Sequence, residues 1–360
     1  MSSKKRKSNI ELLRLFAIFG VIILHYCNPF IGGGIAFAKE GGLNFYCLYF
    51  LVSLFACAVN LFVLISGYFM CESTRRNIWR PIELIVQVIV FNGLIYLLNV
   101  LLKVHTFSVK ACLNALIPAN YFVILYCAVY LVSPWISILF EKATVKSLKK
   151  LLVISFILFS VYPTVVDAFF EITGKQIYGI SSIGLYGSQW GYSFTNFLFM
   201  YILGVCIKKG ALKIQEWKIG FIVLSLIANV WVIVIWARVN DKIGYFTERS
   251  AWEYCNPLVI ITAVLLFALF NKIDIGEKKI INIPAEAVFS VFLLHHVFIP
   301  YLKIEQFVSG NIFVMIAHII VSTIIVFTIC MCVHFIYSLI TKPIFKLLSN
   351  KFGLIIEADK

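Results

Sequence analysis

Two residues with chemical potential, Arg14 and His25, stand within the first long apolar stretch of this 360-residue chain. They are eleven positions apart, and eleven helical steps of about 100° return to within roughly 20° of the same face. The same steps span roughly 16 Å, so Arg14 lies near one end of the helix and His25 far along it. Ionisable groups inside a membrane span are costly, and by default they are functional candidates. An arginine can bind an anion, and a neutral imidazole can act as a general base.

The start of the same stretch predicts how Arg14 is held. Glu11 precedes Arg14 by three positions, which suits an ion pair on one helical face. Ser8 and Glu11 have the spacing of a capping box, which predicts that the helix begins just before Glu11. Taken singly, Arg14 could be an interfacial anchor and His25 a hydrogen-bonded packing residue. The position of both residues on one helical face favours a functional pair.

The composition indicates which kind of molecule positions this pair. The chain is 61% hydrophobic and 13% charged, with a mean hydropathy of +0.95. Soluble domains hold about 45–50% apolar and about 25% charged residues, so a soluble enzyme, a disordered chain and a disulfide scaffold are excluded. The apolar runs lack the two-residue alternation of an outer-membrane barrel. We therefore expect an all-α, polytopic membrane helical bundle of about ten transmembrane helices. They lie near residues 11–30, 45–70, 82–102, 120–140, 151–169, 194–207, 219–237, 254–271, 285–302 and 312–338.

The positive charge of the chain is distributed according to topology. Of the 31 lysines and arginines, 22 fall in alternate gaps that include both ends, and 8 fall in the remaining gaps. By the positive-inside rule, both termini are cytoplasmic. The net charge of +14 is then explained without a nucleic-acid partner. We expect one integral-membrane domain over 1–360, with short basic cytoplasmic ends at 1–9 and 341–360, in the plasma (inner) membrane.

Metal and redox chemistry are not expected. The ten cysteines are scattered through apolar stretches without paired C-x-x-C spacing, and buried cysteine usually behaves as a small hydrophobe. No HExxH motif or Cys/His cluster has the spacing of a metal site.

The pattern from Arg14 to His25 resembles the R-x10-H motif of the acyltransferase-3 family, integral-membrane enzymes that acylate extracytoplasmic sugars and polysaccharides. Other segments resemble that family in order along nearly the whole chain. Departures are aromatic exchanges: Tyr121 stands where the family often has Trp, and Phe292 where it often has Tyr. The matching segments are Asn60–Phe69 with its S-G-[FY] element, the basic turn with Arg75, Arg76, Arg80 and Pro81, and then Tyr126–Pro134, Phe197–Gly204 and Val291–His295.

The resemblance implies a reaction and a set of site residues. His25 would be the general base for an acceptor hydroxyl. The phosphates of cytoplasmic acyl-CoA would bind to a basic cluster by charge-assisted hydrogen bonds, and the pantetheine arm would extend along the helix toward His25. That cluster comprises Arg14, Arg75, Arg76 and Arg80. Residues of second rank are Glu11, Ser66, Tyr68 and His295. Ser66-Gly67 supplies either an oxyanion donor or a close helix contact, and His295 either lines the site or caps a helix end.

Several functions remain open on the sequence alone. The expected partners are acyl-CoA as co-substrate, with acetyl-CoA favoured, a sugar or polysaccharide acceptor, and the lipid bilayer; no cofactor is permanently bound. The acyl group could instead be succinyl, or the acceptor a lipid or other small molecule. A transporter of a glycan precursor or of the acyl group is a different class. Transporters often contain two halves with matching broken helices, which this sequence lacks, and we expect no acidic residue in the middle of a span.

Overall fold

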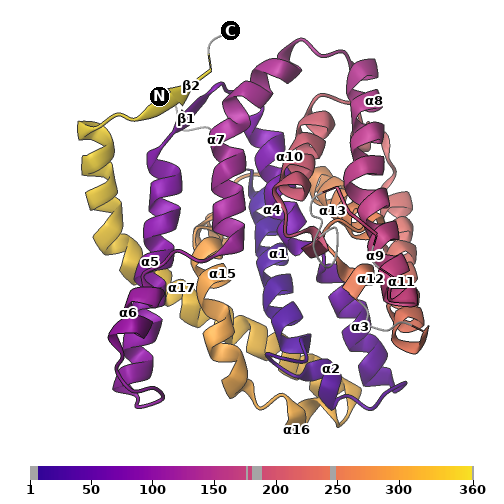
Figure 1. Ribbon diagram of the computed structural model, residues 1–360, viewed down its shortest axis with the longest axis vertical. Helices are drawn as coiled ribbons and strands as arrows, with labels where there is room; N and C mark the ends of the chain where they lie inside the picture. Colours follow the sequence, from indigo (N-terminus) through magenta and orange to yellow (C-terminus); the bar gives the residue numbers. More distant parts are fainter. Residues whose placement is uncertain (1–6, 176, 181–188, 244–248, 359–360) are drawn as a thin grey trace.

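The computed structural model of the chain describes residues 7–175, 177–180, 189–243 and 249–358. Helices make up nearly all of its regular structure (Figure 1). Within these ranges, eight helical segments are long and apolar enough to cross a membrane. They are α1 (Ser8–Cys27), α3 and α4 (Leu43–Phe55, Ala58–Met70), α5 (Trp79–Leu101), α7 (Tyr121–Glu141), α8 to α9 (Val145–Phe156, Tyr162–Thr173), α11 (Ile219–Ile243), α12 and α13 (Arg249–Trp252, Pro257–Lys272) and α17 (Ile312–Lys351).

Two further apolar segments complete the order that hydropathy predicts. Helix α10 (Phe194–Lys208) is shorter than the others. Helix α14 (Lys279–Ala285) and the segment Val288–Leu302 form a pair bent by 62°. Together with the eight longer segments they correspond, one by one, to the ten expected spans. The all-α polytopic fold is therefore confirmed.

Short elements connect these helices. The π turn η1 (Ile157–Val161) joins α8 to α9, and its Ser160 hydroxyl donates a hydrogen bond of 2.6 Å to the carbonyl of Cys255. The segment Val288–Leu302 consists of α15 and η4. The short elements are α2 (Gly34–Phe37), β1 (Arg75–Asn77), α6 (Val109–Ala115), η1 (Ile157–Val161), η2 (Gln189–Gly191), η3 (Ile214–Glu216), α15 (Val288–Phe298), η4 (Ile299–Leu302), α16 (Glu305–Val308) and β2 (Ile355–Glu357).

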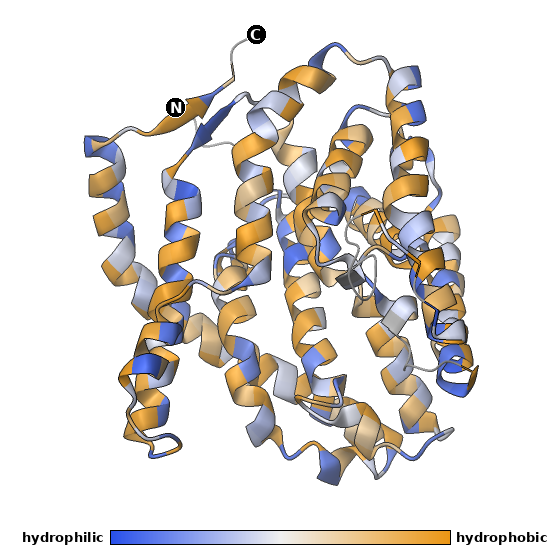
Figure 2. Cartoon of the chain, in the orientation of Figure 1, coloured by the Kyte–Doolittle hydropathy of each residue, from blue (hydrophilic) through white to orange (hydrophobic). Residues whose placement is uncertain are grey.

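Helix α1 lies inside the bundle. It packs against α3, α4, α13, α14, α15 and α17, and Leu13, Ile18 and Ile22 on it are almost completely buried. Large apolar side chains are exposed on the outside of the bundle, as on α5, α11 and α17, and hydrophobic residues make up most of these helices (Figure 2). Such a surface suits lipid rather than water.

The predicted capping box at the start of α1 is wrong. Helix α1 already includes Ser8, and its N-cap residue, Lys7, has no side-chain capping bond. The Ser8 hydroxyl instead donates to Asn282 Oδ1 at 2.9 Å and accepts from the Lys278 amide at 2.7 Å. The neighbouring segment before α14 therefore takes the hydroxyl that a local cap would have used.

The loops between the helices lie on two opposite faces of the molecule, and contacts between loops show which of them share a face. On one face, Lys208 pairs with Glu72 at 3.1 Å, and Lys272 donates to the Gln215 carbonyl. We call this the basic face, because its loops are the lysine- and arginine-rich ones. On the opposite face, Asn44 bonds the Val308 carbonyl at 2.7 Å. Each of these contacts joins loops that ten alternating crossings would place on the same side.

A two-stranded antiparallel sheet lies on the basic face. Strands β1 and β2 pair Arg75 with Glu357 and Asn77 with Ile355. The sheet therefore attaches the segment after α17 to the turn between α4 and α5 (Figure 1).

Helices α4 and α10 touch through two glycines. A Cβ atom on Gly67 would lie 2.0 Å from the Tyr201 carbonyl oxygen, and one on Gly204 would lie 2.2 Å from the Leu64 carbonyl oxygen. Only glycine permits such a close backbone approach. Of the two roles open to Ser66-Gly67, Gly67 therefore makes the close helix contact.

Candidate functional site

The structure brings His25 of α1 and His295 of α15 together. Their ring centroids are 4.6 Å apart, with an angle of 73° between the planes. His295 is 2% exposed, and its Nδ1 lies 2.9 Å from the Val291 carbonyl oxygen. His25 is only partly buried. His25 is thus partly accessible, whereas the His295 ring against it is enclosed.

Aromatic rings connect this pair to a second polar group. The Phe292 centroid lies 6.4 Å from that of His295 and 5.0 Å from that of Phe122 on α7. Phe122 stacks on Tyr126 at 5.7 Å, with an angle of 14° between the rings. The Tyr126 hydroxyl in turn lies 3.3 Å from Ser66 Oγ. The two histidines and Ser66 therefore border one continuous aromatic wall.

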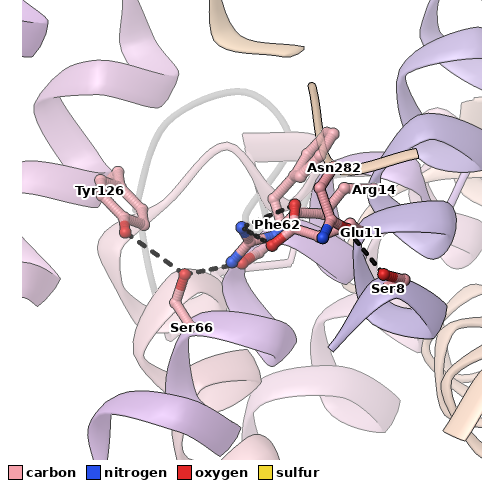
Figure 3. A network of polar contacts seen from close by, with 7 residues as sticks. All are labelled: Ser8, Glu11, Arg14, Phe62, Ser66, Tyr126 and Asn282. Atoms are coloured by element: carbon pink, nitrogen blue, oxygen red, sulfur yellow. Dashed lines mark hydrogen bonds and ion pairs between the residues drawn. The ribbon is translucent and has the colours of Figure 1, made fainter. Parts of the chain in front are cut away.

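The Ser66 hydroxyl is already engaged. Its oxygen lies 2.9 Å from the Phe62 carbonyl oxygen, one helical turn back. Figure 3 draws this contact together with the one to Tyr126. Because Ser66 bonds both its own helix and Tyr126, it links α4 to α7. This is in keeping with a packing role beside Gly67.

Arg14 is held as the sequence predicts. Its Nη1 lies 3.2 Å from Glu11 Oε1, and the two side chains face each other across one turn of α1 (Figure 3). The Glu11 side chain is 10% exposed, whereas the Arg14 side chain is 36% exposed. The carboxylate thus fixes a guanidinium that remains accessible.

Arg76 differs from the other predicted donor-binding arginines, because its side chain is buried. It is 5% exposed, and its Nε donates to Ser133 Oγ at 2.7 Å. Nη1 donates to the Ser73 and Arg75 carbonyls, and Nη2 donates to the Met70 carbonyl at 2.8 Å. This side chain joins β1 to the end of α4 and to α7.

Arg75 and Arg80 are exposed on the basic face. Arg75 Nε donates to Glu357 Oε1 at 2.6 Å, and this bond holds the pKa of Glu357 below its ordinary value. Arg80 pairs with Glu83 at 3.2 Å at the start of α5. Arg14 makes its ion pair within α1, so the polar contacts described here do not join it to these arginines.

Tyr68 lies beside a polar hollow on the basic face. The Lys208 ammonium sits 5.1 Å from the centroid of its ring. The hollow has a volume of about 390 Å³ between α4, α7 and α10. It is lined by Cys71, Glu72, Thr74, Ser137, Glu141, Lys208 and Lys209. In the sequence these lysines follow the positive-inside pattern and belong to no motif, so nothing there predicts the hollow.

Three carboxyl groups that the sequence analysis does not single out are buried near the ends of the apolar segments. Asp167 and Glu171 on α9 are fully buried, and Glu253 is 2% exposed. Glu171 accepts hydrogen bonds from the Asn240 amide at 2.8 Å and from Ser250. Asp167 lies at the end of the expected span 151–169, and Glu171 and Glu253 lie just outside the expected spans, so the prediction of no acidic residue in the middle of a span is not contradicted. The four-residue spacing of Asp167 and Glu171, which places both on one helical face, was the clue to their common burial.

Comparison with known proteins gives one match. A family model described as an acyltransferase domain matches residues 7–335. No curated protein and no solved structure matches the chain. The matched range includes α1 with both Arg14 and His25, the basic turn and His295 on α15.

Proposed function

This chain belongs to the acyltransferase-3 family and is a membrane acyltransferase, and from that premise we propose that it acylates a hydroxyl of an extracytoplasmic sugar or polysaccharide. The donor in this proposal is cytoplasmic acyl-CoA, with acetyl as the transferred group. The observation that carries the proposal is a helix inside the bundle with an accessible arginine toward the basic face and a partly accessible histidine far along it. That arrangement can connect a donor on one side of the membrane with an acceptor on the other.

The donor's phosphates bind at the basic face in this proposal. Arg75 and Arg80 are exposed there, and Lys208 and Lys209 line the neighbouring hollow. Arginine and lysine both form charge-assisted hydrogen bonds with phosphate. Arg76 has another task, because its N–H groups bond Ser133 and main-chain carbonyls. Arg76 stabilises the fold of the basic turn, which carries Arg75 and Arg80.

The transfer itself needs one base. The acceptor hydroxyl gives its proton to His25, and its oxygen attacks the thioester carbonyl carbon. An ester C–O bond forms, the thioester C–S bond breaks, and the departing thiolate takes the proton from the imidazolium. Neither a metal nor a redox step enters this balance.

A succinyl donor or a lipid acceptor would use the same geometry. A transporter would instead draw on the buried carboxyl groups. Glu171, however, bonds Asn240 and Ser250, and so connects α9 to α11 and α12. We therefore favour the enzyme over the transporter.

The test replaces His25 and analyses the glycans of the cell. With His25→Ala and His25→Gln, mass spectrometry should detect the loss of one acyl increment while abundance persists. Binding of acetyl-CoA should also persist, because Arg14 lies roughly 16 Å from His25 along the helix. His105→Gln, in an exposed loop, is the matched control and should leave the glycan unchanged. A substantially active His25→Gln enzyme would refute the assignment of the base.

A further inference from the structure

Two buried histidine nitrogens on facing helices lack a hydrogen-bond partner among the described residues. They are Nδ1 of His25 and Nε2 of His295. The two rings meet edge to face at 4.6 Å between centroids. Buried polar atoms are nearly always paired, and pairing matters more where the surroundings are apolar. Two such atoms on adjacent rings therefore call for a common explanation.

The tautomer of His295 follows from its hydrogen bond to the main chain of α15. Its Nδ1 lies 2.9 Å from the Val291 carbonyl oxygen, which can only accept. Nδ1 therefore carries the proton. A neutral imidazole has a single N–H, so Nε2 of His295 carries a lone pair and is an acceptor.

Nδ1 of His25, on the adjacent ring, supplies the complement. If Nδ1 of His25 carries its proton, it can donate to Nε2 of His295, and both unpaired atoms are satisfied at once. The lone pair of His25 then lies on its other nitrogen, Nε2. This is the nitrogen that a general base needs.

We propose that His295 is the positioning residue of His25, which it orients and holds in the Nδ1–H tautomer through an Nδ1–H···Nε2 bond that forms when the two rings turn from their edge-to-face contact. The inference deepens the proposed function and rests on it. In serine proteases a carboxylate orients the catalytic imidazole in the same way. Here a neutral imidazole does so, and its own orientation comes from the main chain of α15 through Val291.

The order of events is simple. The acceptor hydroxyl loses its proton to Nε2 of His25, while Nδ1–H keeps its bond to His295. The proton on Nε2 later passes to the departing thiolate, so His25 returns to the same tautomer. His295 gains and loses no proton and makes no contact with substrate in this scheme.

The experiment compares His295→Phe with His295→Gln in membranes that hold the full chain. The probe is radiolabelled acetyl-CoA, with transfer to the glycan of the host measured at several acetyl-CoA concentrations. Phe retains a ring of similar size but has no acceptor, whereas the Gln Oε1 can accept the Nδ1–H of His25. His296→Phe is the matched control, because His296 is the adjacent, exposed histidine with a centroid 6.0 Å from that of His295.

His295→Phe should lower the maximal rate roughly 10- to 100-fold, the range seen for partners that orient metal-bound imidazoles. The KM for acetyl-CoA should not change. His295→Gln should restore the rate to within a few-fold of the native rate, and His296→Phe should have no effect. If the Phe variant does not accumulate, His295→Met provides a second apolar side chain that adapts to its surroundings.

Two outcomes would overturn the inference. One is an apolar variant that keeps more than half of the native rate, and the other is a Gln variant no better than Phe. Failure of the proposed function is distinguishable, because an active His25→Gln enzyme would remove the base itself. An inactive His25→Gln with an active His295→Phe would remove only the role of His295.

Discussion

Replacing Gly67 with alanine should separate helices α4 and α10. The new Cβ would lie 2.0 Å from the Tyr201 carbonyl oxygen, and ordinary contact begins at 3.4 Å. The obstacle is a helix backbone rather than a flexible side chain. The helices must therefore move apart locally by about 1.4 Å, the difference between these two distances.

The cost can be set against the gain in helix propensity. Overpacking typically costs about 1–3 kcal/mol, and a backbone obstacle places Gly67→Ala near the upper end. Alanine regains about 1 kcal/mol over glycine inside a helix, which leaves a net destabilisation of about 2 kcal/mol. Gly93→Ala on α5 is the matched control, because its Cβ would meet only Leu116 Cδ2 at an ordinary 3.7 Å. The control should be stabilised by up to about 1 kcal/mol.

Thermal unfolding of the purified proteins in detergent measures the difference. Gly67→Ala should unfold below the native protein and Gly93→Ala at or above it. Transfer activity should fall as well, since Ser66, next to Gly67, connects α4 to Tyr126 at 3.3 Å. Equal unfolding temperatures for the two variants would refute the close-contact reasoning.

Two further predictions concern the basic face. Arg76→Ala should reduce the abundance of the protein in the membrane, because hydrogen bonds to charged groups contribute about 1.5–3 kcal/mol each. Arg80→Ala should leave the abundance unchanged and weaken acetyl-CoA binding. Equal abundance of the two variants would contradict the structural role of Arg76. The pKa of Glu357 is held below its ordinary value of 4.5 by Arg75, so the contribution of this pair exists above that value and disappears as the pH falls through the lowered pKa. As the pH falls over that range, pepsin digestion near residues 352–358 should accelerate by more than the activity of pepsin itself rises, and Glu357→Gln should show only the pH dependence of pepsin.

The sequence predicts much of the fold because the membrane imposes long apolar segments. The ten segments follow in their expected order, and the Glu11–Arg14 pair follows from the helical period. Segment ends are less predictable, since they depend on distant partners. Ser8 shows this, because its hydroxyl bonds Asn282 rather than its own helix.

The candidate site is only half visible in the sequence. His25 could be singled out as a titratable group in an apolar helix, but its neighbour His295 lies 270 positions away, and only packing brings the two rings together. Arg76 differs from Arg75 only in the direction of its side chain in β1. Asp167 lies in a hydrophobic stretch whose average hydropathy conceals it.

The two-stranded sheet has a consequence for biosynthesis. Arg75 and Glu357, which it joins, are 282 residues apart, so at about 5–20 residues per second the ribosome delivers β2 roughly 14 to 56 s after β1. During that interval β1 has no strand partner, and the hydrogen bonds of Arg76 to α4 and α7 and of Tyr130 to the Asn77 carbonyl hold the basic turn. The β1–β2 sheet can therefore form only after α17 has been synthesised and packed into the bundle. A truncation before Ile355 would leave every apolar segment in place yet lack this last fastening step.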